Sequence, residues 1–508
     1  IVSLLAEKTR LFLEKPGQSL KMVFEYDPAK AGDILADCFK PARETARACR
    51  LELGSVLDSW EKTLASQAGG ENLWLVLWTK SDILEAGARK KSQKNHFNAL
   101  GAVLGWPGQK EGIGLPELRQ AHRGTITALR EALTDSGLLN RTLPARELLR
   151  DIRSALFPDL TPPVWEAWLP GDRRPFILPE TNEKLETLLT FPRLSEQLFP
   201  HQAVIWKRDF VILGDRLHAP FFLAVPPREP KPFNELFRSL SRHRYPWRLA
   251  CDLSSGDPGQ WSLDSLLARI FGLTSVKNRL LQGALENLKA LRNQGAALVG
   301  VSFCLDTWVE ILRYPSLAAA ENALRRQLAE LERLLSGWGQ TTLQLVTGDP
   351  LLGVCGALPG LIRKTPAPRA LAPLEEAFSF LPLRPASAWN RGPLVFLSPD
   401  GKPLPFWPNS SAQAAWIDLG VAPMGSGKSV LLNTLNLAFC LQPGLDELPL
   451  LSVIDVGPSS MGLIALLKNA LPPHLKPQAA GCRLRPTPEY SINPLDTPLG
   501  LRSPLPGH

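Results

Sequence analysis

The residues of this sequence best suited to chemistry form a short glycine-rich run that ends in a lysine and a serine. The run consists of Ala422, Pro423, Met424, Gly425, Ser426, Gly427, Lys428 and Ser429, with Val430 next. It fits the phosphate-binding pattern G-x-x-x-x-G-K-[ST], with alanine in place of the first glycine. That replacement costs little, because the first position mainly needs a small side chain. Gly425 and Gly427 let the backbone turn tightly, so that successive N–H groups can point at a polyphosphate.

The run predicts binding of ATP and Mg²⁺. A helix that begins near Lys428 would add the positive end of its dipole. Lys428 can reach the terminal phosphates, and the hydroxyl of Ser429 is placed to bind Mg²⁺. The alternative is an ordinary Gly-Ser loop with a solvated lysine. An apolar run before the loop and a helical run after it favour the phosphate-binding interpretation, with residues 422–430 as the nucleotide site.

Hydrolysis of ATP also needs an acidic residue on a neighbouring strand. Asp455 ends the apolar run 450–456, which we interpret as a buried strand, and it lies 27 residues after Lys428. No second acidic residue follows it directly. Two interpretations stay open: Asp455 contacts the nucleotide or its metal, or it caps the turn at Gly457–Ser459.

The elements predicted around the loop form a region that starts near Phe378. Residues 394–397 and 404–407 flank Pro399-Asp400-Gly401, which predicts a β-hairpin. Residues 416–421 follow as a strand, and residues 430–441 as a helix. We assign 378–508 to one domain that contains the loop.

The remaining chain divides into two further predicted regions. Residues 1–180 show helical patterns and little strand signal, which predicts a helical accessory domain with helices at 1–15, 42–67, 115–133 and 145–156. Residues 181–377 alternate between the two patterns, which predicts an α/β or α+β domain with a helix-covered sheet. Its expected helices are 183–198, 234–242, 275–292 and 318–336, and its expected strands are 203–206, 210–213, 219–225, 247–253, 297–305 and 341–346.

Composition excludes several classes of protein. The 508 residues are 44% apolar and 21% charged, so the chain is not a wholly disordered one and has room for two to four domains. No apolar run is long enough to cross a membrane. Seven cysteines without a C-x-x-C pair argue against a zinc site and against a disulfide scaffold. The net charge of +8 permits an acidic partner but does not require one.

Two basic stretches could serve other partners. Residues 242–248 mix basic and aromatic side chains, which suits nucleic acid or an acidic partner but equally a solvated loop that enters a strand. Arg141, Arg146, Arg150 and Arg153 have helical spacing, which suits a partner or lipid-headgroup surface but equally an exposed helix face. We do not expect direct binding of nucleic acid.

The region around the loop resembles a known family. The runs GVAPMGSGKSVLLNTLNLAF, LLSVIDVGPSSMGLIALLKNAL and SINPLDTPLG are similar to the DotO/IcmB/TraU family, the ATPases of type IV secretion and of related plasmid conjugation systems. This family belongs with the VirB-class secretion ATPases. The matching positions are Lys428 and Ser429, then Asp455, Gly457 and Ser459, then Asn493-Pro494-Leu495. The similarity is strong over 414–500 and weaker over 181–383.

The resemblance implies a RecA-like motor domain, of which 378–508 is the first part, behind an α/β docking domain at 181–377. It implies ATP hydrolysis, a homo-oligomer, and a cytoplasmic place, peripheral at the inner membrane, among the components of a secretion or conjugation complex. The catalytic acidic residues and any arginine finger would follow His508. A part without them should bind nucleotide poorly, because an incomplete sheet cannot hold the loop rigidly.

Two alternative functions stay open. The chain could be a non-catalytic docking component of the same complex, held mainly through residues 1–380. It could also be a DNA-pumping motor of the FtsK/TraD kind. That alternative predicts a transmembrane segment and DNA-stimulated hydrolysis, and we place it last because the sequence shows no such segment.

Overall fold

A computed structural model describes residues 2–84, 87, 116–172, 193–255 and 286–481, apart from positions 15–16, 170–171, 226, 228–231, 289, 364, 385, 414, 416, 418, 422, 424 and 455–458. The chain forms two compact units, and each contains segments that are far apart in the sequence. Unit 1 comprises Ile1–Ala29 and Gly69–Ala386. Unit 2 comprises Lys30–Ala68 and Ser387–His508. The chain therefore enters unit 2, returns to unit 1, and enters unit 2 again about 320 residues later.

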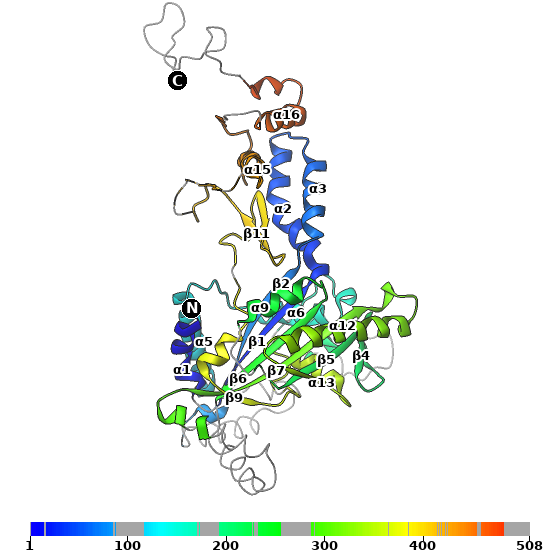
Figure 1. The fold of residues 1–508 in the computed structure, drawn as a ribbon, viewed down its shortest axis with the longest axis vertical. Coiled ribbons are helices and arrows are strands. Elements are labelled where there is room, and N and C mark those ends of the chain that lie inside the picture. Colours follow the sequence, from blue (N-terminus) through cyan, green and yellow to red (C-terminus); the bar gives the residue numbers. More distant parts are fainter. Residues whose placement is uncertain are drawn as a thin grey trace, which may run out of the picture. The chain divides into compact units, whose positions relative to one another are not determined.

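The strands of unit 1 build one large sheet (Figure 1). In chain order they are β1 (Gln18–Asp27), β2 (Gly70–Thr79), β3 (Val204–Trp206), β4 (Phe210–Leu213), β5 (Arg216–Val225), β6 (Trp247–Ser255), β7 (Leu298–Glu310), β8 (Thr342–Leu345) and β9 (Ala370–Pro373). The strand order is β2-β1-β6-β7-β5-β4-β3, with β8 also paired to β5 and β9 to β7. All of these pairs are antiparallel.

The helices of unit 1 are α1 (Val2–Leu13), α5 (Pro116–Asp135), α6 (Ala145–Leu156), α8 (Leu194–Leu198), α9 (Phe233–Ser241), α12 (Leu317–Gly337), α13 (Pro350–Ala357) and α14 (Leu374–Ser379). Short 3₁₀ turns lie at Pro28–Lys30, Ser81–Ile83, Pro158–Leu160 and Ile311–Arg313, the first of them at the boundary between the units.

The two faces of the sheet differ in chemistry because side chains alternate along each strand. On one face, Phe24 of β1, Leu249 of β6 and Phe303 of β7 belong to the main apolar core. Buried side chains from α1, α5, α9, α12 and α14 complete this core. The alternate residues of the same strands point to the other face, where α6 and α13 pack against β4. Both faces of the central strands are therefore buried.

The second face contains a buried row of charged side chains. Arg248 donates from Nε and Nη2 to Glu25 Oε2, at 2.9 Å and 2.6 Å, and its Nη1 lies 3.5 Å from Asp306 Oδ2. His218 Nδ1 lies 2.9 Å from the same Asp306 oxygen. The side chains of these four residues are at most 1% exposed. The guanidinium of Arg248 also lies 5.0 Å from the ring centroid of Trp308, which adds a cation–π contact.

A buried lysine ties the segment after α13 to this face. Lys21 Nζ donates to the carbonyl oxygens of Gly356 and Ile362, at 3.0 Å and 2.9 Å, and lies 3.6 Å from Asp252 Oδ1. Burial raises the pKa of Asp252 to about 7, and the charge of Lys21 opposes part of that rise. The folded chain therefore holds a proton on Asp252 that the unfolded chain releases near its ordinary pKa of 3.8.

This difference in pKa predicts how stability depends on pH. The stabilising contribution of protonated Asp252 is fully present below about pH 4 and is lost as the pH rises through about 7. A difference of about three pKa units corresponds to a fall of about 4 kcal/mol in the free energy of unfolding of unit 1. Urea unfolding between pH 4 and pH 8 checks this, and Asp252→Asn should flatten the dependence. Asp446→Asn, at an exposed site in unit 2, is the control, and an Asp252→Asn curve as steep as the wild-type curve would contradict the assignment.

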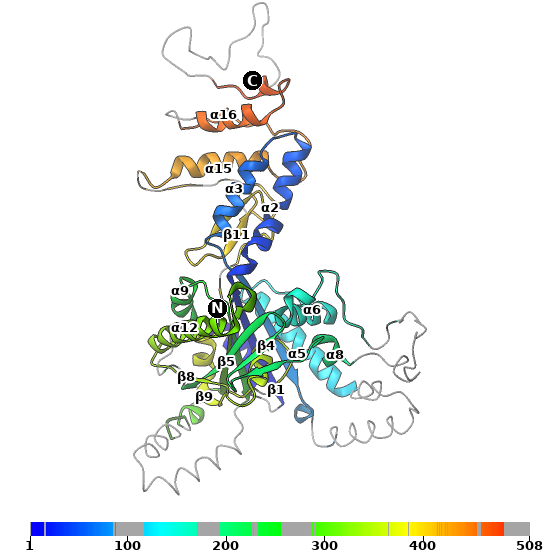
Figure 2. The same ribbon diagram turned by 90° about the vertical axis from the view of Figure 1, so that its right-hand side faces the viewer.

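Unit 2 combines an early helical hairpin with the region of the glycine-rich loop. Its elements are α2 (Ala31–Ala48), α3 (Gly54–Ala65), β10 (Leu394–Leu397), β11 (Pro403–Phe406), α15 (Lys428–Cys440), α16 (Met461–Ala470) and a 3₁₀ turn at Lys476–Gln478. Figure 2 shows α15 and α16 beside α2 and α3. Leu35, Phe39 and Leu57 of the hairpin share a buried core with Leu437 and Leu441. The hairpin is therefore part of the unit that carries the loop.

The structure divides the chain differently from the three consecutive domains expected from the sequence. Residues 1–180 do not form a helical domain, because β1 and β2 are ten-residue strands of the large sheet. The single helix expected at 42–67 is two helices. They are separated at Arg50, which has a positive φ of 57°, and Pro41 lies inside α2 instead of preceding a helix. Pro41 was a misleading boundary signal, because Lys40 and Pro41 both continue a helix that starts at Ala31.

Most other predicted elements are confirmed within a few residues. The helices expected at 1–15, 115–133, 145–156, 234–242 and 318–336 correspond to α1, α5, α6, α9 and α12. The six strands expected between 203 and 346 correspond to β3–β8, and the hairpin near Pro399 corresponds to β10–β11. The helix expected at 275–292 falls largely outside the described residues, and only the end of the one expected at 183–198 is described, as α8. The class of mixed helices and strands is confirmed, with an antiparallel sheet.

Candidate phosphate-binding loop

The predicted loop forms a tight turn immediately before a helix. Gly425 and Gly427 have φ angles of 78° and 93°, and Gly427 is the N-cap residue of α15. Ser426 Oγ donates to the carbonyl oxygen of Pro423 at 2.6 Å, which closes the turn. The helix begins at Lys428, as the sequence predicts.

Glycine is needed at these two positions because of the backbone conformation, and not because neighbouring atoms leave no space for a side chain. A Cβ atom added at Gly425 or Gly427 would meet no other atom within 4 Å. Both φ values, however, lie in the left-handed region, which costs other L-residues about 1–2 kcal/mol. The pattern of two glycines one residue apart is therefore explained by the shape of the turn.

The amino-terminal end of α15 is exposed, and its first turn contains no acidic residue. The first intrahelical hydrogen bond runs from the amide of Leu431 to the carbonyl oxygen of Gly427, at 2.9 Å. Amides that precede it point out of the helix end, where the helix dipole is positive. The first turn contains no Asp or Glu, and Lys428 and Ser429 are both exposed. This end of the helix can accept an anion such as a phosphate group.

The residues predicted to flank the loop as buried strands are exposed. Residues 415, 417 and 419–421 form no strand, and Ile417, Leu419 and Val421 are each more than 80% exposed. Residues 450–454 likewise form no strand, and Leu450 and Ile454 are fully or nearly fully exposed. The strand predicted at 416–421 and the buried strand predicted at 450–456 are therefore both wrong for the described residues. The physical reason is that no described segment pairs with these backbones. Without a paired strand, they lack both the hydrogen bonds of a sheet and neighbouring side chains that would bury them.

Several predicted site residues lie outside the described residues. These are Ala422, Met424 and Asp455, together with the motif Asn493-Pro494-Leu495. The structure thus brings together Pro423 and Gly425–Val430 at the end of α15. A link from this helix to the segment near Asp455 is present, because Asn433 Nδ2 donates to the carbonyl oxygen of Ser459 at 2.8 Å.

The α2–α3 hairpin supports the loop helix, and this support was not predicted from the sequence. Thr45 Oγ donates to the carbonyl oxygen of Gln442 at 2.8 Å, two residues after α15 ends. The amide of Glu52 donates to the carbonyl oxygen of Ala470, the last residue of α16, at 2.8 Å. The two contacts join residues 397 and 418 positions apart in the sequence, so no local pattern could have predicted them.

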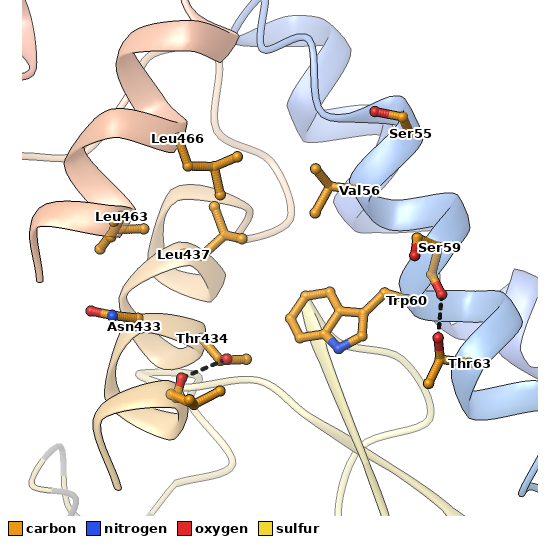
Figure 3. Close-up of a pocket in the computed structure, with 12 residues that line it drawn as sticks. Ser55, Val56, Ser59, Trp60, Thr63, Asn433, Thr434, Leu437, Leu463 and Leu466 are labelled. Atoms are coloured by element: carbon orange, nitrogen blue, oxygen red, sulfur yellow. Dashed lines mark hydrogen bonds between the residues drawn. The ribbon is translucent and has the colours of Figure 1, made fainter. Parts of the chain in front are cut away.

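A groove of about 610 Å³ lies among α3, α15 and α16 (Figure 3). Trp60 projects into it from α3, and Leu437 and Leu466 approach it from the two other helices. The residues that line it carry no charge. The groove is next to the loop helix but does not contain Lys428 or Ser429.

Several side chains of the two basic stretches make contacts within unit 1. Arg141 and Arg146 pair with Glu147 and Asp172, Arg150 donates to the carbonyl oxygen of Pro163, and Arg153 lies 4.7 Å from the ring centroid of Trp165. In the stretch 242–248, Trp247 and Arg248 are buried, and His243 stacks on Tyr245.

Neither a membrane-spanning helix nor a cluster of metal ligands is found in the described parts of the chain. There, no helix combines the length and the hydropathy that crossing a bilayer requires. Over the same residues, no three His, Cys, Asp or Glu side chains gather in a way that would suit a metal ion. A magnesium ion held by a phosphate-binding loop needs no such cluster, because the nucleotide, one hydroxyl and water molecules supply its ligands.

Comparison with protein-family models gives no match for this chain, and comparison with curated proteins also gives none.

Proposed function

We propose that the protein binds ATP with Mg²⁺ at Ala422–Ser429 and acts as an ATPase. The observation that carries this proposal is the turn with Gly425 and Gly427 at positive φ, placed directly before the first residue of α15. Lys428 would neutralise charge on the β- and γ-phosphates, and Ser429 would hold Mg²⁺. The bound ion would supply further charge neutralisation at the phosphates.

The proposed system is type IV secretion or conjugation, where the protein would power assembly or transport at the cytoplasmic face of the inner membrane. The resemblance around Lys428, Asp455 and Asn493 supports this part of the proposal. A RecA-like domain would then be built on the loop, with the catalytic acidic residues outside the residues described. Partners would be other components of that complex and further copies of the same chain.

The test of ATP and magnesium binding uses Ser429. Ser429→Ala should lower ATP turnover at least tenfold at a fixed low magnesium concentration and raise the magnesium concentration needed for half-maximal turnover. Ser429→Thr is the matched control and should retain turnover, because threonine supplies the same hydroxyl and fits the same pattern. ATP turnover is measured as the release of phosphate by the whole protein. Equal magnesium dependence of the wild-type protein and Ser429→Ala would refute the assignment.

A docking role without catalysis is the second candidate. The exposure of Ile417, Leu419 and Val421 favours it, because the segment that leads into the loop has no rigid support in the described residues. Such a protein would bind nucleotide weakly without turning it over. The same assay, combined with a direct measurement of nucleotide binding, separates the two candidates.

A further inference from the structure

Burial changes sharply along the loop helix. In its carboxyl-terminal half, Leu437 and Ala438 are buried, and Ala438 is 0% exposed. In its amino-terminal half, Val430 is 70% exposed, and Leu431 and Leu432 are also exposed. One end of α15 is thus part of a core, and the end that bears the phosphate-binding residues is not.

The buried end is fixed to the α2–α3 hairpin. Leu437 and Leu441 lie in the shared core, and the hydroxyl of Thr45 holds the carbonyl oxygen of Gln442 just past the helix. Cys49 Sγ approaches the carbonyl oxygen of Leu445 at 3.6 Å. These contacts hold the carboxyl-terminal end of α15 against α2.

The groove separates the amino-terminal half of α15 from α3. Val430 and Thr434 line it on one side, and Ser55 and Ser59, one helical turn apart, line it on the other. Figure 3 shows Thr63 and Thr434 bonded within their own helices, to the carbonyl oxygens of Ser59 and Val430 at 2.8 Å and 2.7 Å. Two of the hydroxyls in the groove are therefore used locally, and an approach of the helices need not break them.

We propose that α15 is a hinged helix, fixed at its carboxyl-terminal end, whose amino-terminal half closes the groove against α3 when phosphate binds at the loop. Closure would bury the apolar atoms of Val430 and Trp60, which favours it. The small side chains of Ser55 and Ser59, and the lack of a side chain at Gly462, leave room for the movement. Because Asn433 bonds the carbonyl oxygen of Ser459, the segment before α16 would move with the helix. This inference rests on the proposed function, since phosphate is the trigger.

Distance measurement between spin labels tests the hinge in the whole chain. One label pair is placed at Ser59→Cys and Thr434→Cys across the groove. The control pair is Arg47→Cys and Asp446→Cys, at exposed sites beside the fixed end. The background carries Cys482→Ser, and the six described cysteines are buried. Distances are recorded with and without a non-hydrolysable ATP analogue and Mg²⁺, and binding of the analogue is measured on the same labelled samples.

We expect the groove pair to shorten by about 2 Å or more with the analogue, the scale of known helix shifts, while the control pair stays constant. Binding of the analogue without a change in the groove pair would overturn the hinge and leave the proposed function intact. If no analogue binds, the proposed function fails, and the hinge is judged without nucleotide. In that case the widths of the two distance distributions are compared. If the distances between the groove labels are distributed as narrowly as those between the control labels, the hinge is overturned. A broader distribution for the groove labels supports movement about the fixed end.

A filled groove gives an independent check. Ser59→Phe should block closure and weaken binding of the analogue about tenfold, and Ser59→Ala should leave binding within about twofold. Equal affinities of Ser59→Phe and the wild-type protein would contradict the hinge, provided that both unfold at the same temperature.

Discussion

Replacement of Lys428 by alanine is expected to reduce ATP turnover at least 100-fold and to weaken nucleotide binding. Lys428 is the first residue of α15 and is exposed beside the turn formed by Gly425 and Gly427. Removing a single group that stabilises charge in a transition state commonly costs a factor of about 10²–10³. A lysine at this position meets the most highly charged part of the nucleotide, so its loss should fall in that range.

The control for this variant is Lys468→Ala. Lys468 is also an exposed lysine near a helix end in unit 2, but it belongs to α16 and lies outside the loop. The two variants remove the same charge from the same unit, so only a site-specific role separates them. Turnover is measured by phosphate release, and thermal unfolding shows whether each variant is folded. Retained turnover in Lys428→Ala would refute the assignment of the loop.

The glycine-rich loop was predictable because its information is local. Two left-handed positions need glycine, and a helix must start at the next residue, so eight consecutive letters determine both the conformation and the chemistry. The structure confirms the conformational part of this prediction, because Gly425 and Gly427 have positive φ and α15 begins at Lys428. The same reasoning explains why α6 and β10–β11 could be placed from sequence patterns alone.

The support of the loop was not predictable, because it depends on contacts between distant segments. The hairpin of α2 and α3 is inserted between β1 and β2, two strands that pair with each other, and it belongs to the unit of α15. Likewise, the apolar runs at 416–421 and 450–456 indicated strands, the second of them buried. A strand needs a neighbouring segment to pair with, and the pattern of one run does not show whether that segment is present. Their apolar side chains are exposed, so an apolar pattern shows that a segment could be buried but not that it is buried.

The charged face of the sheet was missed for a different reason. Lys21 and Glu25 of β1 interrupt an apolar pattern, and polar residues at those positions suggest a solvated face or no strand at all. They are buried because their charged partners, Arg248 and Asp252, come from β6, more than 200 residues later. When the polar residues of a strand pair with residues on neighbouring strands, the sequence of that strand alone resembles the sequence of an exposed segment.

The energetic consequence of that face is the second large effect that we expect. Arg248→Met should lower the free energy of unfolding of unit 1 by about 3–5 kcal/mol, because it leaves the carboxylates of Glu25 and Asp306 buried without their cation. Arg391→Met is the control. Arg391 also pairs with a carboxylate, that of Asp37, but both side chains are about half exposed, so its loss should cost less than about 1 kcal/mol.

Urea unfolding measures both variants, with the transitions of the two units fitted separately because a single two-state transition is not expected for two units. The double variant Glu25→Gln, Arg248→Met then distinguishes pairing from packing. If the cost arises from an unpaired buried charge, removal of that charge should restore part of the stability, and the two substitutions should couple by at least 1 kcal/mol or so. Additive costs would instead assign the role of Arg248 to its contact with Trp308, 5.0 Å away. A cost for Arg248→Met no larger than that for Arg391→Met would mean that the buried row is solvated in solution and does not hold the sheet as described.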